Sequence, residues 1–259
     1  MSWQRKAGAV IVALVALAAM VSLVWTPYDP LQTEVAARLQ GTSASHWMGT
    51  DQFGRDILSR VMDGARLTLT VAVGAVALSG LVGVPLGIWA GMRRDASRFV
   101  MAGADLLLAF PALLLAIVFT AVFGASIWIV VLAIGIAGIP AFVRVARAGT
   151  LQVMQRDYIL AARIAKVSGP AIAWRHVLPN IWPLVLTQVS VAVALAILAE
   201  AGLSFLGLGA PAPYASWGRM LQASQPYLAT SPHLALWPGA AIALTVLGFN
   251  LLGHADDRR

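Results

Sequence analysis

The sequence has no cysteine, and only 11% of its 259 residues are Asp, Glu, Lys or Arg. The missing cysteine excludes disulfides, thiolate nucleophiles and cysteine-ligated metal sites. The scarcity of charge leaves too little polar surface to cover a water-soluble domain, because 59% of the residues are hydrophobic and the mean hydropathy is +0.80. These values predict an all-α polytopic membrane protein.

Motifs of enzyme chemistry are also missing. The chain has only two lysines, Lys6 and Lys166, and neither follows a glycine, so it contains no P-loop for nucleotide phosphates. The four histidines are scattered with no ligand spacing, at His46, His176, His233 and His254. We therefore expect no catalytic residue, no metal site and no bound cofactor. If ATP and magnesium drive transport, another chain must use them.

Six apolar runs reach the roughly 20 residues that a membrane-spanning helix needs. They cover about 7–25, 67–91, 99–123, 127–146, 181–206 and 235–252. The first run follows basic residues and contains Ala16-Leu17-Ala18, which is also compatible with a cleavable signal sequence. Its apolar character continues to Trp25, a length that favours a retained transmembrane helix.

Basic residues alternate between the links that join these runs. If the N-terminus is inside, the inner links hold 13 Lys and Arg and the outer links hold 5. The positive-inside rule then predicts a multi-pass protein with both termini in the cytoplasm. The net charge of +7 is spread over short clusters rather than one continuous face, so we expect no nucleic-acid partner.

The longest polar link, residues 144–180, holds six basic residues and one acid, Asp157. Its sequence is RVARAGTLQVMQRDYILAARIAKVSGPAIAWRHVLPN. Asp157 is predicted to cap a helix that continues through Lys166. Gly169-Pro170 is predicted to break this helix before a second helical stretch that ends near Pro179. A segment of this kind between two spans indicates that another protein binds it from the cytoplasmic side.

Two further patterns suggest local structure. Gly83, Gly87 and Gly91 form a doubled GxxxG pattern that allows a second helix to approach closely, either within the chain or from a partner subunit. Charged residues at helical spacing over 55–63 predict a short amphipathic helix at the outer surface.

Two carboxylates fall within apolar runs, Asp105 and Glu200. Because a charge inside a membrane is costly, such groups either serve the transport pathway or are satisfied by neighbours. A cation such as Arg98, or a backbone donor, is the expected neighbour of Asp105. Glu200 is expected near the outer interface, within reach of water.

Several blocks carry a family resemblance. DYILAARIAKVSGPAIAWRHVLPN resembles the cytoplasmic EAA loop of binding-protein-dependent ABC importer permeases. HWMGTDQFGRDILSRVMDGAR, DLLLAFPALLLAI, EAGLSFLGLG and SWGRML are similar to the C-type permease of dipeptide, oligopeptide and nickel importers, in family order. The resemblance implies the type I ABC importer permease fold. It divides the chain into 1–66 (first helix and extracytoplasmic segment), 67–253 (transmembrane core with the loop at 144–180) and 254–259 (cytoplasmic tail).

The same resemblance implies partners and site residues. The expected partners are a homologous second permease, two ATPase subunits, an extracytoplasmic solute-binding protein and membrane lipid, at the bacterial inner membrane. The implied ATPase-coupling residues are Asp157, Tyr158, Ile159, Ala161, Ala162, Arg163, Lys166, Val167 and Gly169, with Tyr158, Ile159, Arg163, Lys166 and Val167 as direct contacts. Candidates for the pathway or its gate are Asp105, Phe110, Pro111, Glu200, Ser204 and Phe205.

The chain departs from the family pattern at Leu160, often glutamate, and at Lys166, typically the glycine that bends the loop. Gly169 is expected to supply the bend instead. A peptide is the favoured substrate, with nickel or a metal chelate as an alternative. An ion-coupled secondary transporter and a membrane scaffold without transport remain the alternatives from other classes.

Overall fold

A computed structural model describes residues 3–209, 211 and 213–253. Across these residues the regular structure is helical, and extended pairing is limited to an isolated bridge between Thr50 and Asp56. The α-helices are α1 (Trp3–Val21), α2 (Ile57–Met92), α3 (Arg94–Leu108), α4 (Ala112–Phe123), α5 (Ile127–Val153), α6 (Asp157–Ile164), α7 (Gly169–Ile172), α8 (Leu178–Phe205), α9 (Trp217–Ser224) and α10 (His233–Gly253). The shorter elements are the 3-10 turns η1 (Val35–Ala37) and η3 (Gln225–Tyr227) and the π-helix η2 (Ala173–Val177).

Five of the six predicted spans are found as single helical stretches. Five helical stretches among the described residues are long and apolar enough to cross a membrane: α1, α2, α5, the run 169–205 and α10. The pair α3 and α4 passes the same test only together, with a bend of 79°, which makes it either a broken sixth span or a re-entrant loop. The prediction of one straight helix over 99–123 is therefore wrong. The helix breaks near Pro111 because proline has no amide hydrogen to continue the backbone hydrogen bonds of α3. Pro111 is the N-cap of α4.

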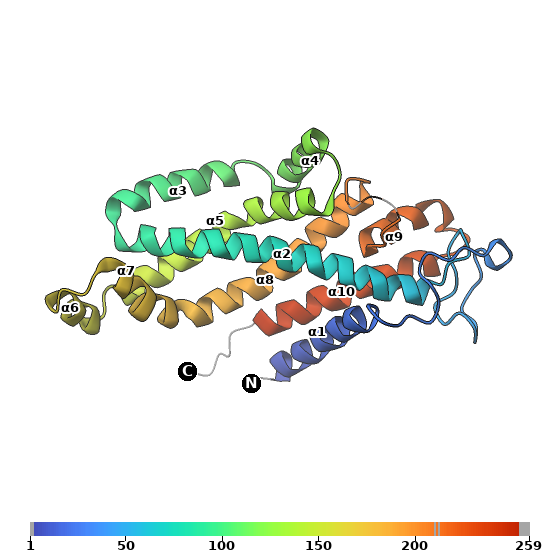
Figure 1. Cartoon of the computed structure of the whole chain (residues 1–259), viewed down its shortest axis with the longest axis horizontal. Coiled ribbons are helices and arrows are strands. Elements are labelled where there is room, and N and C mark those ends of the chain that lie inside the picture. Colours follow the sequence, from blue (N-terminus) through green and yellow to red (C-terminus); the bar gives the residue numbers. More distant parts are fainter. Residues whose placement is uncertain (1–2, 210, 212, 254–259) are drawn as a thin grey trace.

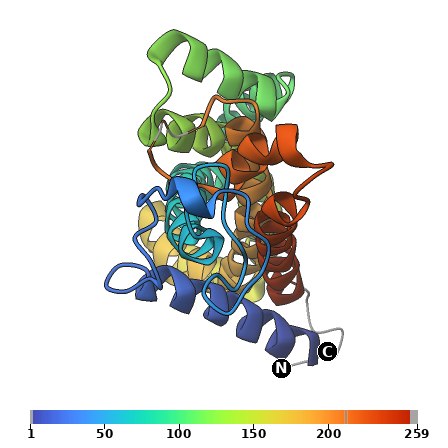
Figure 2. The same ribbon diagram turned by 90° about the vertical axis from the view of Figure 1, so that its right-hand side faces the viewer.

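The long helices α2, α5 and α8 form the centre of an elongated bundle (Figure 1). Helices α1 and α10 pack together on one side of this centre, and α3 and α4 lie on the other (Figures 1 and 2). Helices α6 and α7 protrude at one end, while the polar segment 22–56 covers the opposite end. The coupling segment and the outer segment of the sequence prediction are thus at opposite ends of the bundle.

Glycine allows the close packing of α2 on α5. A Cβ atom added at Gly83 would lie 2.6 Å from the Cβ of Phe142, and one at Gly87 would lie 2.5 Å from the carbonyl oxygen of Val143. Gly91 meets the side chain of Thr150 in the same way. The prediction of a close helix approach is confirmed, and the second helix belongs to this chain.

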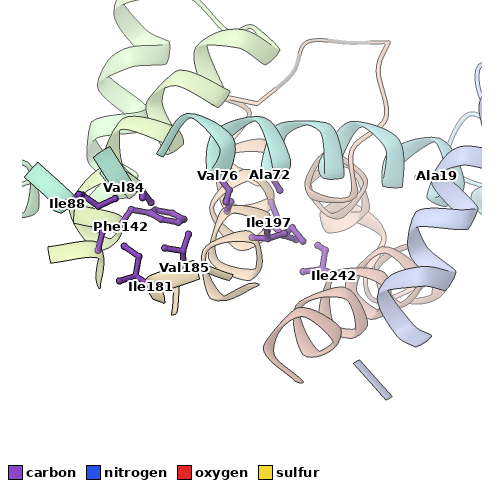
Figure 3. Close-up of a cluster of buried hydrophobic side chains, with 14 of the residues drawn as sticks. Ala19, Ala72, Val76, Val84, Ile88, Phe142, Ile181, Val185, Ile197 and Ile242 are labelled. Atoms are coloured by element: carbon purple, nitrogen blue, oxygen red, sulfur yellow. The ribbon is translucent and has the colours of Figure 1, made fainter. Parts of the chain in front are cut away.

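Apolar side chains fill the space where the central helices meet. Val84 and Ile88 of α2 face Phe142 of α5, with Ile181 and Val185 of α8 beneath them (Figure 3). Further along α8, this core extends to α10. The cluster connects the coupling end of the bundle to its middle.

The separate amphipathic helix predicted over 55–63 is not present, because α2 itself begins at Ile57. Asp56 caps α2, accepting hydrogen bonds from the backbone amide of Ser59 at 2.8 Å and from its hydroxyl at 2.7 Å. Arg55 and Arg60 form ion pairs with Asp51 of the preceding loop, at 2.7 and 3.6 Å. The loop therefore neutralises these charges and fixes the start of α2.

Candidate functional site

The polar segment that follows α5 begins with α6. Asp157 is the first helical residue and Arg156 is the N-cap, with no hydrogen bond from its side chain to the helix. The prediction that Asp157 caps the helix is therefore wrong. Its carboxylate lies in the first turn and Arg163 in the last, which is the arrangement that the helix dipole favours.

Helix α6 ends in a Schellman motif centred on Lys166. The amide of Lys166 donates to the carbonyl of Arg163, and that of Val167 donates to the carbonyl of Ala162, both at 3.0 Å. Lys166 takes the left-handed conformation at this motif, with φ of 57°. Gly169 instead has an ordinary φ and begins α7, so the expectation that it supplies the bend is wrong.

Beyond the bend, α7, η2 and α8 form one uninterrupted helical run over 169–205. The predicted helix end near Pro179 is wrong. Pro179 follows directly after the π-helical turn of η2, and the helical run continues past it. Helix α7 is thereby continuous with a candidate membrane span.

One face of the coupling segment is buried against the bundle. Ile159, Ala162, Ile172 and Val177 are at most 9% exposed and belong to the main hydrophobic core. Ile159, at 1% exposure, cannot contact a partner, so its assignment as an ATPase contact is wrong. These side chains connect α6, α7 and η2 to the main hydrophobic core.

The opposite face of α6 is exposed and partly apolar. Tyr158 is 43% exposed, Leu160 60% and Ile164 75%. Leu160 and Ile164 are four residues apart, which places them on the same face of the helix. This pair was missed as a contact surface, although its spacing was visible in the sequence. Ala161 and Lys166 are exposed as well.

Arg163, Val167 and Gly169 lie near the C-terminal end of α2. Together with residues of α2, α7 and η2 they line an apolar groove. The implied coupling residues thus fall into two groups: some are exposed on the outer face of α6, and the others line this groove or lie in the core.

The bent pair of helices is attached to α5 by two arginines. Arg144 forms an ion pair with Asp105 at 2.7 Å, and Arg147 donates a hydrogen bond to the hydroxyl of Ser97 at 2.9 Å. The partner of Asp105 is therefore Arg144 rather than Arg98. Both side chains of the ion pair remain about half exposed, at 59% and 52%. Phe110 is also exposed, at the break between α3 and α4.

Glu200 lies in a dry polar cluster, so the expectation that water reaches it is wrong. Its residue exposure is 1%, and it accepts hydrogen bonds from the hydroxyls of Thr68 at 3.1 Å and Ser204 at 2.6 Å. Ser216, the N-cap of α9, also donates to it. The cluster joins α2, α8 and α9, and these contacts support a structural role. No sequence spacing could have paired Thr68 with a residue 132 positions away.

A small cavity of about 180 Å³ lies between α2, α4, α5 and α8. Most of its lining is alanine or glycine, and Ser79 and Gln188 are its polar side chains. In the part of the chain that the structure describes, no group of three or more His, Asp or Glu side chains is placed to hold a metal ion. His254 and the tail 254–259 lie outside the described residues.

Comparison with known proteins gives one consistent family. Residues 83–255 match the family described as binding-protein-dependent transport system inner membrane component. The chain is 38% identical over 247 residues to the dipeptide transport system permease protein of Alkalihalophilus pseudofirmus, covering 95% of this chain and 81% of that protein. It is 39% identical over 249 residues to the glutathione transport system permease protein of Pectobacterium atrosepticum, covering 95% and 82%.

Proposed function

The chain belongs to the family of binding-protein-dependent transport system inner membrane components, and we propose that this permease subunit of a peptide importer couples to separate ATPases through its segment 144–180. It forms half of the translocation path, and a homologous permease forms the other half. Two ATPase subunits use ATP and magnesium, and an extracytoplasmic binding protein delivers the solute. Both termini are cytoplasmic in this proposal, since α1 begins and α10 ends toward the end of the bundle that carries α6 and α7.

The observation that carries this proposal is the construction of the coupling segment. Its inner face is buried in the core, while its outer face presents Leu160, Ile164 and Lys166. An exposed apolar pair flanked by basic charge is suited to a protein groove with an acidic rim. We therefore revise the ATPase contact surface to Tyr158, Leu160, Ile164 and Lys166.

Closure of the ATPase pair on ATP binding moves this surface. The displacement reaches the spans by two routes: through the continuous run from α7 into α8, and through the buried anchors Ile159 and Ala162 of α6. A lever of this kind supports alternating access, in which the path opens outward with ATP bound and inward after hydrolysis.

The translocation path is proposed along the face that carries the α3–α4 bend. This face exposes Phe110, Pro111 and the Asp105–Arg144 ion pair, which are suited to contact the charged ends of a peptide or to form a gate. Phe205, 41% exposed at the far end of α8, remains a candidate there. We assign Glu200 and Ser204 to the structural cluster rather than to the path.

Uptake by reconstituted protein tests the proposal. The chain is purified with its bound partners, placed in liposomes, and supplied with the binding protein and a labelled dipeptide. Uptake that requires ATP on the side of α6, in the absence of an ion gradient, is the expected result. Uptake by this chain alone under a proton or sodium gradient would instead establish the secondary transporter.

A further inference from the structure

A groove lies where the C-terminal end of α2 meets the coupling segment. Its volume is about 680 Å³, within the range of ligand-binding pockets. The walls are mainly apolar, and Arg93 and Arg163 are the two charged side chains among them. It is not part of the coupling surface or of the proposed path.

The length of the groove along α2 is close to the thickness of the hydrocarbon region of one membrane leaflet. It follows α2 from Val84 to Arg93, nine residues apart, which is about 13 Å at roughly 1.5 Å per residue. Half of the hydrocarbon core of a bilayer is about 15 Å thick. The arginine thus stands at the polar edge of the leaflet while the opposite end of the groove reaches toward the bilayer midplane.

Tryptophans mark the mouth of the groove. Trp89 is 49% exposed and Trp174 is 71% exposed, and both line the wall. A shallower hollow that shares Trp174 and Leu178 continues along α8 to Trp182, itself 49% exposed. Because tryptophan concentrates at the boundary between lipid chains and headgroups, these positions place the mouth at that boundary.

The charge at the rim is uncompensated. Among the described residues neither Arg93 nor Arg163 forms an ion pair, and the groove lining contains no Asp or Glu. Guanidinium groups bind phosphate oxygens through paired hydrogen bonds, and basic pockets between helices at the membrane surface suit anionic headgroups.

We propose that this groove binds one anionic phospholipid from the leaflet on the side of the coupling segment. The phosphate lies between Arg93 and Arg163, and an acyl chain follows α2 toward Pro85. The lipid would then contact a span and the coupling segment at once, filling the space between α2 and α7. An apolar slot with a basic rim fits a lipid better than a water-soluble ligand, which would leave the long apolar wall without a partner.

Lipid retention by the purified transporter complex tests this proposal. The probe is phosphatidylglycerol, added in detergent and counted by native mass spectrometry. The wild type is expected to retain one tightly bound molecule, and the double variant Arg93→Gln/Arg163→Gln to bind it at least about tenfold more weakly, because two charged hydrogen-bonding groups are lost. Arg94→Gln removes the same charge outside the groove lining and is expected to behave as the wild type.

A second variant tests the apolar part of the groove without changing charge. Gly169 lines the groove and a Cβ there would meet no atom within 4 Å, so the side chain of Gly169→Leu has room to enter the groove and should also weaken retention. Equal retention in the wild type, in the double variant and in Gly169→Leu would overturn the proposal. So would a photocrosslinker at residue 174 that captures the second permease in place of lipid. None of these readouts depends on transport.

Discussion

Lys166 shows how a single residue shapes the coupling segment. It occupies the C′ position of α6 with φ of 57°, a conformation that costs a residue with a Cβ roughly 1 to 2 kcal/mol relative to its ordinary one. The family resemblance identified this position as a departure, but nothing in the sequence indicated that the lysine would adopt the glycine conformation. The hydrogen bonds of the helix end are made by backbone atoms, so they form with either residue.

Replacing Lys166 with glycine is expected to stabilise the end of α6. Lys166→Gly relieves the strained conformation, whereas Lys166→Ala removes the same charge and keeps the strain. Hydrogen exchange of the α6 amides should therefore be slower in Lys166→Gly than in Lys166→Ala, by a difference of about 1 kcal/mol in opening free energy. Equal exchange in the two variants would show that the conformation carries no strain.

Glu200 is expected to contribute to stability rather than to ion coupling. Glu200→Gln presents an amide N–H₂ where one of the hydroxyl donors needs an acceptor, so we expect a loss of about 1 to 3 kcal/mol. Thermal unfolding of the purified complex measures this loss, and Ser190→Ala, whose hydroxyl bonds only within α8, is the control. A Glu200→Gln protein of normal stability that transports nothing would contradict this assignment.

At the scale of helices, the apolar runs predicted the candidate spans. They did not predict where one span bends or which helices continue into each other. The run over 99–123 did not reveal the bend, although Pro111 was visible, because a proline is tolerated within some membrane helices. The continuity from Gly169 to Phe205 was hidden by Pro179, which follows the π-helical turn of η2 without ending the helical run. The structure of a helix junction depends on neighbouring helices, which a local pattern does not contain.

The contact between α2 and α5 gives a prediction with a matched control. Gly87→Ala places a methyl group 2.5 Å from the carbonyl oxygen of Val143 and 2.7 Å from the Cβ of Ala146, so the helices must separate. Gly80→Ala in the same helix meets Phe142 at an ordinary 3.7 Å. We expect Gly87→Ala to lower stability by about 1 to 3 kcal/mol and Gly80→Ala to be neutral or stabilising. Thermal unfolding of both variants checks this; similar midpoints would contradict the close packing.

At the scale of the whole molecule, burial decides which residues of the coupling segment are available to a partner. The resemblance proposes a coupling segment, yet it could not distinguish Ile159, which is buried, from Leu160 beside it, which is exposed. That distinction depends on which face of α6 packs onto the hydrophobic core. The pairing of Asp105 with Arg144 likewise depends on helix packing.

Leu160 and Ile164, the exposed apolar pair on α6, are expected to bind the ATPases. Leu160→Ser/Ile164→Ser removes two apolar side chains from the contact, and we expect the ATPases to bind about tenfold to hundredfold more weakly. The second permease should still co-purify, because the spans are unchanged. Val35→Ser, which alters an equally exposed apolar residue at the opposite end, is the control. Unchanged co-purification of the ATPases with the double variant would exclude this surface.

The most direct test of the coupling segment uses the absence of cysteine. Ile164→Cys gives the chain a single thiol on the exposed face of α6, and Val35→Cys gives one at the other end. In the assembled complex, a short thiol-reactive crosslinker should join Ile164→Cys to an ATPase subunit, and the yield should change when ATP is added. Val35→Cys should form no crosslink to an ATPase subunit. A complex that retains its ATPases but gives no crosslink from Ile164→Cys, or gives one from Val35→Cys, would contradict the account.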